Sequence, residues 1–585
     1  MGFDTVERAV DLCVVGGGLA GLCAAVAAAR RGAKVALMQD RPMLGGNASS
    51  EIRMWVCGAH GENLRETGIL EELMLENLYR NPDCNYAIWD GVLLECAQRE
   101  ENLTLLLNCS CLSCEMDGNR IASVTGWQLT TQKFQKVRAA LFADCSGDSV
   151  LAPITGAQFR VGREARSAFG EAIGHETADS QTMGMSLLIQ AREHARASTF
   201  LPPDWAHRYT KQSLAHRVPD LQNPMENFWY LELGGTGDSI ADTETVRDEL
   251  LKCAYGIWDY IKNAPENREK NKNWRLDWMG ILPGKRESRR YVGDHMLTQN
   301  DIAAGGRFPD TIAYGGWPMD DHDPRGFLSD GPPNVNHPAP SPYGIPYRCL
   351  YSINIENLMF AGRNISATHA AMSSARVMAT CAILGQAMGT AAAIAIRNGV
   401  SPRGVYEKHI EELRQALMDD DCYLPHAVRE VDAISREAAL TPGCEALRNG
   451  HDRPIGTSCN AVDLEKRAAV EYQFDSPRYV ENARIVFDSD LNRKLMGVLP
   501  LRNMPCNRPL DMPDAHLPES LVRGYRLEAV DEHGAMICIA DVKDNRRRLR
   551  RHRIAQAITM LRLIPLDTWG AEKCRIFSFD MQAGK

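Results

Sequence analysis

Apolar and polar positions change period several times near the start of the chain. Residues 11–15 are a short apolar run, residues 16–21 are mostly glycine, and residues 22–31 are an alanine-rich run long enough for a helix. A second apolar run, residues 34–38, follows at the distance that one crossover helix needs to return beside the first strand. The pattern predicts a strand, a glycine turn, a helix and a parallel strand.

The same strand pattern returns twice farther along the chain. Residues 141–148 predict a strand that ends in a tight polar turn, and residues 357–361 predict another strand. A block of small polar residues, 368–374, and a long apolar helix follow. We expect these segments to join the first ones in a single α/β domain, with the residues between them forming an insertion.

The C-terminal part has a different pattern. Residues 403–417 predict a closing amphipathic helix, and short alternating strands such as 469–474, 484–487 and 534–541 are separated by turn signals. These strands predict a small β-sandwich. It weakly resembles the jelly-roll modules attached to carbohydrate-active enzymes, although a packing or dimerisation role is favoured over sugar binding.

The glycine turn fits the pattern G-x-G-x-x-G between a strand and a helix. Gly16 allows the tight turn, Gly18 lets backbone approach a pyrophosphate, and Gly21 lets helix and strand pack closely. The end of the second strand commonly carries an acid for the ribose hydroxyls, but here Gln39 precedes Asp40. Either side chain could take that role, and the turn alone does not distinguish FAD from NAD.

Four blocks carry a family resemblance: residues 44–50, 141–148, 357–364 and 368–374. At these blocks the chain resembles FAD-dependent oxidoreductases with the glutathione-reductase-like FAD fold, in the group with G-G-N-x-S-S-E after the second strand. The resemblance covers roughly residues 9–420. Further matching stretches are 162–166, 284–290, 297–301 and 343–348.

The resemblance implies FAD as the cofactor and a set of residues along it. A helix beginning near Ser373 would point its N-terminus at the flavin ring, where its dipole favours negative charge. The implied cofactor-binding residues are Gly16, Gly18, Leu19, Ala20, Gly21, Gln39, Asp40, Arg41, Gly45, Gly46, Asn47, Ser49, Ser50, Gly147, Asp148, Gly362, Arg363, Ser373 and Ser374.

We therefore expect an α/β protein with a Rossmann-like FAD-binding domain, an inserted α+β substrate domain and a C-terminal β-sandwich-like domain. At 585 residues the chain is too long for one hydrophobic core. The expected parts are 1–155 and 346–420 for the FAD-binding domain, 156–345 for the insertion, 421–455 for a connecting segment and 456–585 for the sandwich.

Substrate chemistry needs a proton carrier and groups that orient substrate oxygen. His369, in the last flavin block, is the first candidate for the proton, and His60 is the second. A structural or cofactor-anchoring role is an open alternative for both. Arginines suit oxygen or carboxylate recognition, so Arg286, Arg290 and Arg348 are candidates, with structural pairing to nearby acids as the alternative for Arg286 and Arg290.

Composition limits the partners. The net charge of −9 argues against general nucleic-acid binding, and the arginine-rich run 546–553 is expected to be a solvated turn or an anion-contacting face. No window is expected to reach the length of a transmembrane helix, and scattered cysteines suit a cytoplasmic protein. We expect that the chain can form homo-oligomers.

No metal site is expected. An alternating strand would place Cys109 and Cys111 on one face and Cys114 on the other, which suits packing. His322, flanked by acids, is expected in a solvated loop, and covalent attachment of the flavin to Cys57 or His60 is not favoured.

The preferred function is an FAD-dependent oxidoreductase that transfers a hydride between flavin N5 and a small polar substrate, with a carbohydrate-like compound as the best substrate candidate. The electron acceptor is unknown. The alternatives are a lyase or hydrolase that oxidises a sugar transiently, and a flavin-bound scaffold without turnover.

Overall fold

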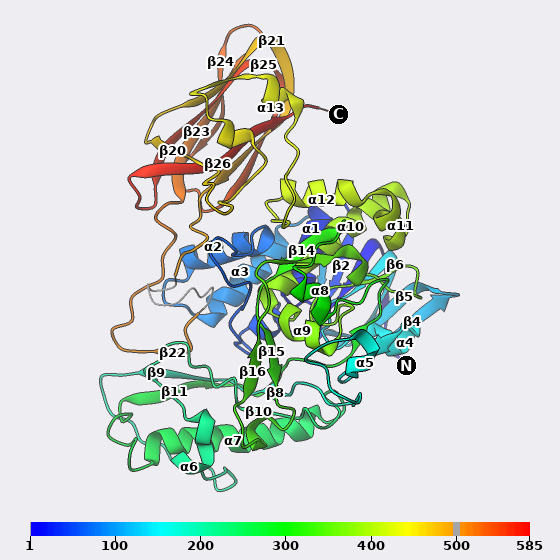
Figure 1. Cartoon of the computed structure of the whole chain (residues 1–585), viewed down its shortest axis with the longest axis vertical. Helices are drawn as coiled ribbons and strands as arrows, with labels where there is room; N and C mark the ends of the chain where they lie inside the picture. The colour runs from blue at the N-terminus through cyan, green and yellow to red at the C-terminus, as the bar shows by residue number, and fades with distance from the viewer. Residues whose placement is uncertain (1, 495–503, 585) are drawn as a thin grey trace. The chain divides into compact units, whose positions relative to one another are not determined.

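The computed structural model describes residues 2–494 and 504–584. By their internal contacts these residues form two compact units (Figure 1). The first contains residues 2–59, 83–413 and 504–514, and the second contains residues 60–82, 414–494 and 515–584. The expected insertion therefore belongs to the same unit as the nucleotide-binding segments.

A seven-stranded sheet lies at the centre of the first unit. Its order is β3-β2-β1-β6-β5-β4, and β18 pairs with β6. The parallel strands are β1 (Thr5–Val15), β2 (Val35–Met38), β3 (Leu103–Leu106), β6 (Lys133–Asp144) and β18 (Leu358–Phe360), and β4 (Cys109–Asp117) and β5 (Arg120–Gln128) are antiparallel. The strands expected from the apolar runs thus meet in one sheet, although they come from distant parts of the chain.

Two helices pack tightly beside the glycine turn. They are α1 (Leu19–Arg30) and α10 (Met378–Asn398). A Cβ at Gly385 would overlap the carbonyl oxygen of Ala20, and one at Gly389 would overlap that of Ala24. Glycine at these two positions therefore lets the helix backbones approach each other.

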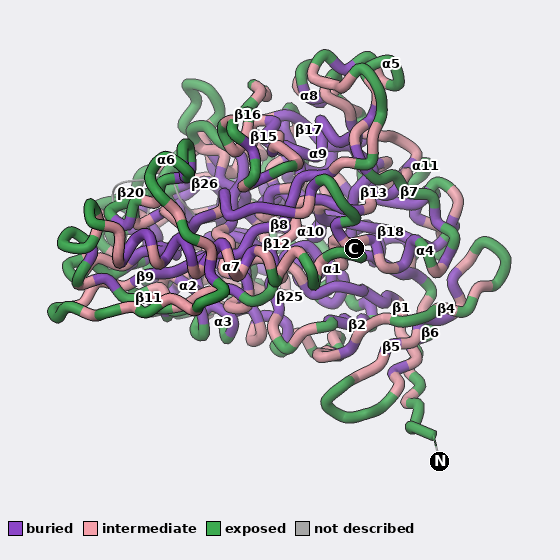
Figure 2. Tube along the Cα trace, turned by 90° about the horizontal axis from the view of Figure 1, so that it is seen from below, coloured by how far each residue is buried: buried purple, intermediate pink, exposed green. Residues whose placement is uncertain are grey.

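Helix α10 is long and apolar enough, by length and composition, to cross a membrane. The expectation that no window reaches that length is wrong. Of its apolar window, 94% is buried inside the protein. Figure 2 draws α10 among the buried segments. A helix that is apolar on all sides suits a position inside a protein core as well as a membrane.

The remainder of the first unit is built from short sheets and one long helix. The helix α7 (Thr243–Asn263) packs into a hydrophobic cluster with residues of the short strands. One sheet has the order β10-β8-β12, another has the order β11-β9-β22, and β15 pairs with β16. Their bounds are β8 (Met185–Ser186), β9 (Ile189–Glu193), β10 (Glu232–Leu233), β11 (Trp274–Met279), β12 (Gly284–Lys285), β15 (Met319–His322), β16 (Asn334–His337) and β22 (Asn507–Arg508).

The cysteines of β4 do not follow a simple alternation. The register of β4 against β5 shifts between Cys111 and Ser113. Cys109 belongs to a buried cluster of the sheet, and both Cys111 and Cys114 pack against that cluster. The prediction that Cys114 faces away is wrong, because the β-bulge adds one residue and returns its side chain to the same face.

A second sheet of seven strands forms most of the second unit. Its order is β20-β26-β21-β25-β23-β24, and β19 pairs with β21. The predicted strands at 469–474 and 484–487 are parts of one long strand, β21. The bounds are β19 (Ala439–Thr441), β20 (Val462–Glu465), β21 (Val470–Phe487), β23 (Val522–Asp531), β24 (Met536–Val542), β25 (Leu549–Thr568) and β26 (Lys573–Gln582).

The arginine-rich run at the start of β25 is paired with acids of the second unit. Of the two expected environments, a solvated turn and an anion-contacting face, the ion pairs with carboxylates agree with the second. The distances are 2.7 Å for Arg546 Nε to Glu76 Oε2, 2.9 Å for Arg547 Nη1 to Glu72 Oε1, 2.9 Å for Arg548 Nε to Asp421 Oδ2, and 2.7 Å for Arg551 Nη1 to Asp420 Oδ1.

Candidate active site

The glycine turn has the geometry that a diphosphate needs. Gly16 has φ of +102°, and a Cβ there would overlap the backbone of Cys145. A Cβ at Gly21 would overlap the carbonyl oxygen of Gly16, whereas one at Gly18 would meet only the Cα of Gly46, at 3.9 Å. Gly18 is also the N-cap of α1 and offers no side-chain cap, so the first N–H groups of the helix are available to an anion.

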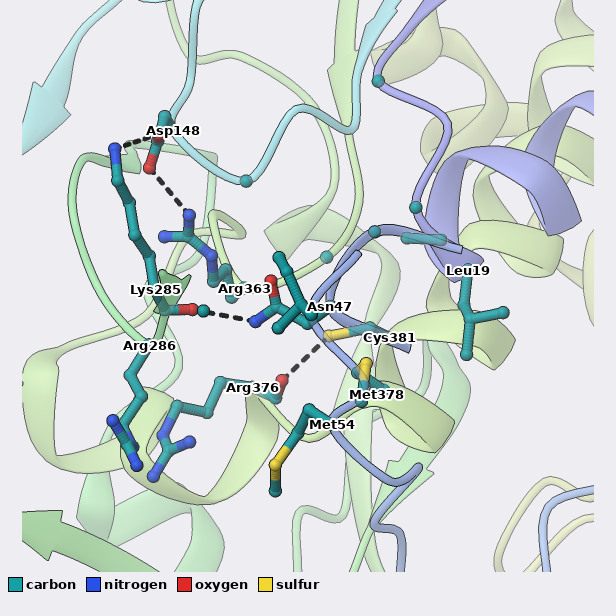
Figure 3. Close-up of a pocket in the computed structure, with 18 of the residues that line it drawn as sticks. Leu19, Asn47, Met54, Asp148, Lys285, Arg286, Arg363, Arg376, Met378 and Cys381 are labelled. Atoms are coloured by element: carbon teal, nitrogen blue, oxygen red, sulfur yellow. Dashed lines mark hydrogen bonds and ion pairs between the residues drawn. The ribbon is translucent and has the colours of Figure 1, made fainter. Parts of the chain in front are cut away.

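One large cavity of about 640 Å³ extends from this turn (Figure 3). Three of the four sequence blocks, residues 44–50, 141–148 and 357–364, contribute to its lining, whereas residues 368–374 do not. The predicted cofactor-binding residues that line it are Gly16, Gly18, Leu19, Ala20, Gln39, Asp40, Arg41, Gly45, Gly46, Asn47, Gly147, Asp148, Gly362 and Arg363. The fold therefore brings most of that predicted set together around one space.

The two ribose candidates at the end of β2 have different surroundings. Gln39 is buried, its Oε1 accepts a hydrogen bond from the backbone N–H of Gly17 at 2.7 Å, and its Nε2 donates to the carbonyl of Met43 at 3.1 Å. Its amide thus holds the glycine turn. The side chain of Asp40 is 62% exposed and lines the cavity, so it is the better placed of the two to meet ribose hydroxyls.

Arg41 supplies a cationic donor at the same end of the cavity. Its Nη1 is buried and makes no hydrogen bond, although Glu51 Oε2 lies 3.4 Å away as an ion-pair partner. A buried N–H without an acceptor is costly, and a phosphate oxygen would satisfy it.

Asp148 organises two cations on the cavity wall. Arg363 Nη2 donates to Asp148 Oδ1 at 2.7 Å, and Lys285 Nζ donates to Oδ2 at 2.9 Å (Figure 3). Burial by itself would raise the pKa of Asp148, but the charges of Arg363 and Lys285 hold this pKa well below its usual range. The carboxylate therefore stays ionised and fixes both cations beside the cofactor space.

Five predicted cofactor residues do not line the cavity: Gly21, Ser49, Ser50, Ser373 and Ser374. The last two belong to α9 (His369–Ala375), so no helix begins near Ser373.

The helix that begins at the cavity is α10. Its N-cap, Val377, has extended backbone and no side-chain cap, and Val377, Met378 and Cys381 line the cavity. The expected start near Ser373 is wrong because the chain breaks helical geometry at Val377 and starts a new helix. The helix N-terminus at the cavity is therefore that of α10.

The far end of the cavity carries a cluster of charged and aromatic side chains. His322 Nδ1 lies 2.7 Å from Glu232 Oε2, and its Nε2 lies 3.3 Å from Asp320 Oδ2. Arg286 Nη1 lies 3.3 Å from Glu232 Oε2, and Arg376 Nη2 lies 3.3 Å from Asp320 Oδ2. Figure 3 shows the guanidinium groups of Arg286 and Arg376 on the same side of the cavity.

This cluster differs from the sequence expectation in one important residue. His322 is buried in β15 and lines the cavity, so the prediction of a solvated loop is wrong. Pairing of β15 with β16 turns His322 inward, where Trp229 packs edge-on against it with ring centroids 5.4 Å apart. Glu232, Arg376 and Trp229 are not among the predicted residues, because Trp229 and Glu232 come from the segment at β10 and Arg376 from the end of α9, both far from His322 in the chain.

His369 and His60 lie outside the cavity lining. Glu287 Oε2 is 2.9 Å from His369 Nδ1, and Asp321 Oδ1 is 3.1 Å from its Nε2. Burial alone would lower the pKa of His369, but these two carboxylates raise it to about 10. A histidine that keeps its proton near neutral pH is a poor base. His60 is exposed.

Two of the predicted arginines have structural partners. Arg290 is fully buried, and its Nη1 donates to Glu164 at 3.0 Å and to the carbonyl of Ala367 at 2.7 Å. Arg348 forms a two-pronged ion pair with Asp310, at 3.0 and 3.1 Å. Neither lines the cavity. Of the three predicted arginines, Arg286 alone lies in the cavity lining.

Comparison with known proteins places the chain in a family. The family model described as FAD dependent oxidoreductase matches residues 11–417, which is more than half of the chain. No curated protein matches.

Solved structures give more distant likenesses. A geranylgeranyl bacteriochlorophyll reductase-like protein from Thermoplasma acidophilum is 14% identical with a TM-score of 0.31, and the match covers 71% of this chain and 86% of that chain. E. coli quinol fumarate reductase is 12% identical with a TM-score of 0.26, covering 73% and 76%. A family 32 carbohydrate-binding module from Streptococcus pneumoniae EndoD is 14% identical with a TM-score of 0.19, covering 25% and 96%.

The residues around the cavity fit FAD. The side-chain-free surface at Gly18, the open N-terminus of α1 and the unsatisfied donor of Arg41 suit the diphosphate, and the N-terminus of α10 suits the flavin end. On the strength of the family match, this chain belongs to the FAD-dependent oxidoreductases and is an enzyme of that class.

Proposed function

We propose that this enzyme oxidises or reduces a small polyhydroxylated, carbohydrate-like compound at the far end of the cavity. One observation carries the proposal: a single cavity is lined both by the predicted cofactor-binding residues and by the cluster of Arg286, Arg376 and His322. FAD, when bound, supplies the hydride acceptor or donor. The chain itself must bind and orient the substrate and move one proton.

His322 is the proposed proton carrier. Glu232 Oε2 lies 2.7 Å from its Nδ1, which fixes the orientation of the ring and leaves Nε2 on the side of Asp320. Burial by itself would raise the pKa of Glu232, but Arg286 and His322 lower it, so this carboxylate remains ionised beneath the imidazole. A histidine held by a carboxylate can accept a proton from a substrate hydroxyl and return it.

The polar groups around His322 support a substrate with several hydroxyls. Arg376 Nε is buried and makes no hydrogen bond, and Arg286 presents a second guanidinium nearby. The amides of Asn334 and Asn336 also line the cavity. These groups can donate to, or accept from, hydroxyl and carbonyl oxygens of the substrate.

Aromatic rings complete the proposed substrate site. Trp229 and Trp317 line the same cavity as His322, Arg286 and Arg376. Sites for small molecules combine such apolar rings with a few placed polar groups, and the apolar faces of sugar rings suit this arrangement.

The proposal is tested by anaerobic reduction of the enzyme-bound flavin. Sugars, hydroxy acids and amines are added in turn under anaerobic conditions, and the flavin absorbance is followed. We expect bleaching by a polyhydroxylated compound and none by simple amines. Bleaching by amines alone, or many turnovers of a sugar without any external acceptor, would contradict simple carbohydrate oxidation; the second outcome points to transient oxidation in a lyase or hydrolase.

A further inference from the structure

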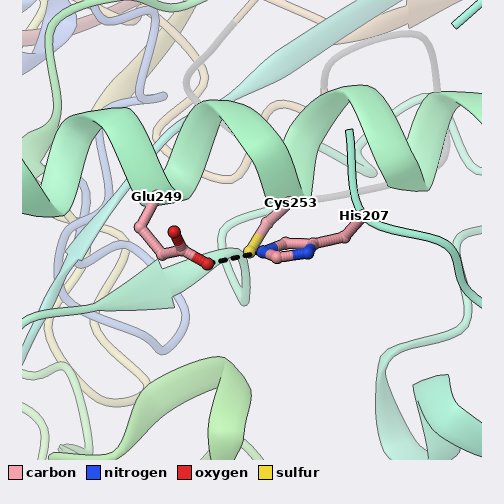
Figure 4. Close-up of side chains that lie close together, drawn as sticks. All are labelled: His207, Glu249 and Cys253. Atoms are coloured by element: carbon pink, nitrogen blue, oxygen red, sulfur yellow. Dashed lines mark hydrogen bonds and ion pairs between the residues drawn. The ribbon is translucent and has the colours of Figure 1, made fainter. Parts of the chain in front are cut away.

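Three side chains with metal-binding atoms meet on α7, away from the cavity lining (Figure 4). Glu249 and Cys253 are four residues apart on this helix, and His207 comes from the preceding segment. The candidate ligand atoms of the three residues all lie within 4.8 Å of one another. Positions i and i+4 share a helix face, so α7 presents both of its side chains to the imidazole.

The backbone around this cluster is shaped to bring His207 close. A Cβ at Gly256 would overlap the carbonyl oxygen of His207. Glycine inside a helix is destabilising relative to alanine, so its presence here has a structural reason. The backbone N–H of His207 also donates to the carbonyl of Lys252 at 3.1 Å. The segment is therefore fixed against the helix face that carries Glu249 and Cys253.

Neighbouring groups orient the ligand atoms. His207 Nε2 lies 2.5 Å from Glu249 Oε1, while Lys252 Nζ donates to Oε2 of the same carboxylate at 2.9 Å. Cys253 is 2% exposed. A partner such as Lys252 fixes the direction of a ligand side chain in metal sites.

We propose that His207, Glu249 and Cys253 bind a zinc ion. One nitrogen, one carboxylate oxygen and one sulfur form a donor set that suits zinc, whereas magnesium and calcium prefer oxygen alone. The thiolate and carboxylate together balance the double positive charge of the ion. Three protein ligands leave one tetrahedral position for water.

Zinc binding follows a balanced exchange. The ion replaces the proton of the Cys253 thiol, which passes to solvent, and it takes the place of the hydrogen bond between His207 and Glu249. No electron is transferred. The bound ion would cross-link the segment at His207 to α7, independently of the flavin chemistry.

The test uses the full chain with its FAD. The purified protein is treated with a chelator, dialysed against zinc and desalted, and zinc is measured by elemental analysis. A parallel sample receives cobalt(II). Its d–d bands lie at longer wavelengths than the flavin bands, and its thiolate charge-transfer band, which overlaps the flavin, is obtained from the difference spectrum against the metal-free holoprotein. We expect about one equivalent of zinc per chain and a cobalt–thiolate signal.

Variants locate the site. We expect Cys253→Ser and His207→Gln each to lose the bound zinc, and Cys459→Ser, which alters an exposed thiol of the second unit, to keep it. His207 is 43% exposed, so its variant tests the site even if Cys253→Ser folds poorly. Retained FAD and an unchanged circular dichroism spectrum identify folded variants. Absence of zinc from the wild type, binding without a thiolate signal, or equal zinc in His207→Gln and the wild type would overturn the proposal.

Discussion

Asp148 Oδ1 lies 2.7 Å from Arg363 Nη2, although the two residues are 215 positions apart in the sequence. Lys285 Nζ occupies the other carboxylate oxygen at 2.9 Å. Asp148 follows β6, Arg363 follows β18 and Lys285 belongs to β12, and all three line the cavity. The carboxylate therefore links these three elements at one cavity wall.

Removing the charge of Asp148 should weaken FAD binding. In Asp148→Asn, Arg363 and Lys285 lose their common anchor, and we expect the FAD dissociation constant to rise roughly 10-fold, which corresponds to about 1.4 kcal/mol. Flavin fluorescence titration of the apoprotein measures this dissociation constant. Asp463→Asn, which breaks an exposed pair with Arg575 in the second unit, is the control. Equal affinities in the two variants would contradict the anchoring role.

Alanine substitutions at two glycines of the turn should have different effects, one on FAD affinity and the other on stability. A Cβ at Gly18 meets only the Cα of Gly46 at 3.9 Å, whereas one at Gly21 overlaps the carbonyl oxygen of Gly16. We expect Gly18→Ala to keep its melting temperature without FAD and to bind FAD at least about 10-fold more weakly, because the methyl group occupies the path of the diphosphate. Gly21→Ala should lower the melting temperature of the apoprotein. Thermal melts with and without FAD separate the two effects. Identical melting temperatures of the two variants under both conditions would contradict this prediction.

Replacing His322 should slow flavin reduction without releasing FAD. General acid–base groups contribute roughly 100-fold or more to rate, so we expect a loss of that size in His322→Gln with a substrate that reduces the wild type. His337→Gln alters a histidine on the paired strand β16 and is the control. Stopped-flow absorbance measures the rate of flavin reduction in the wild type and in both variants. An unchanged rate would exclude His322 as the proton carrier.

The buried ion pairs of His369 should make stability depend on alkaline pH. Its folded-state pKa of about 10 lies above the ~6.5 of an unfolded histidine, so protonation stabilises the folded state. That contribution is complete below pH ~6.5 and is lost as pH rises through about 10. In His369→Gln, which leaves Glu287 and Asp321 without their cation, we expect a loss of about 3 kcal/mol near pH 7.

Thermal denaturation between neutral pH and pH ~10 measures this effect. The melting temperature of the wild type should fall more steeply with pH than that of His369→Gln, so that the two curves converge at high pH. His533→Gln, which alters an exposed histidine, is the control and should follow the wild type. Parallel curves for His369→Gln and the wild type would contradict the assignment.

The arginine-rich run should not create a nucleic-acid site. Arg546 is paired with Glu76 and Arg548 with Asp421, so their charges are already compensated within the second unit. We expect no binding of duplex DNA at physiological salt by fluorescence anisotropy. Tight, salt-dependent binding that is lost in Arg546→Ala would contradict this prediction.

Local patterns in the sequence determined the nucleotide-binding core. The apolar runs predicted β1 and β2, Gly16 and Gly21 have the close approaches that their motif requires, and the space at Gly18 is open. The approach of Gly21 to Gly16 is local, so spacing alone reveals it, whereas the approach of Gly16 to Cys145 follows from the pairing of β1 with β6. The family match over residues 11–417 agrees with the FAD expectation.

Tertiary structure alone decided which polar side chains share the cavity. His322 faces inward because β15 pairs with β16, and Glu232 reaches it from β10, 90 positions earlier. His369 instead lies between Glu287 and Asp321, which come from other segments and hold its proton. Local spacing carries no information about such encounters, because the field and partners of a titratable group come from whichever distant segments fold against it.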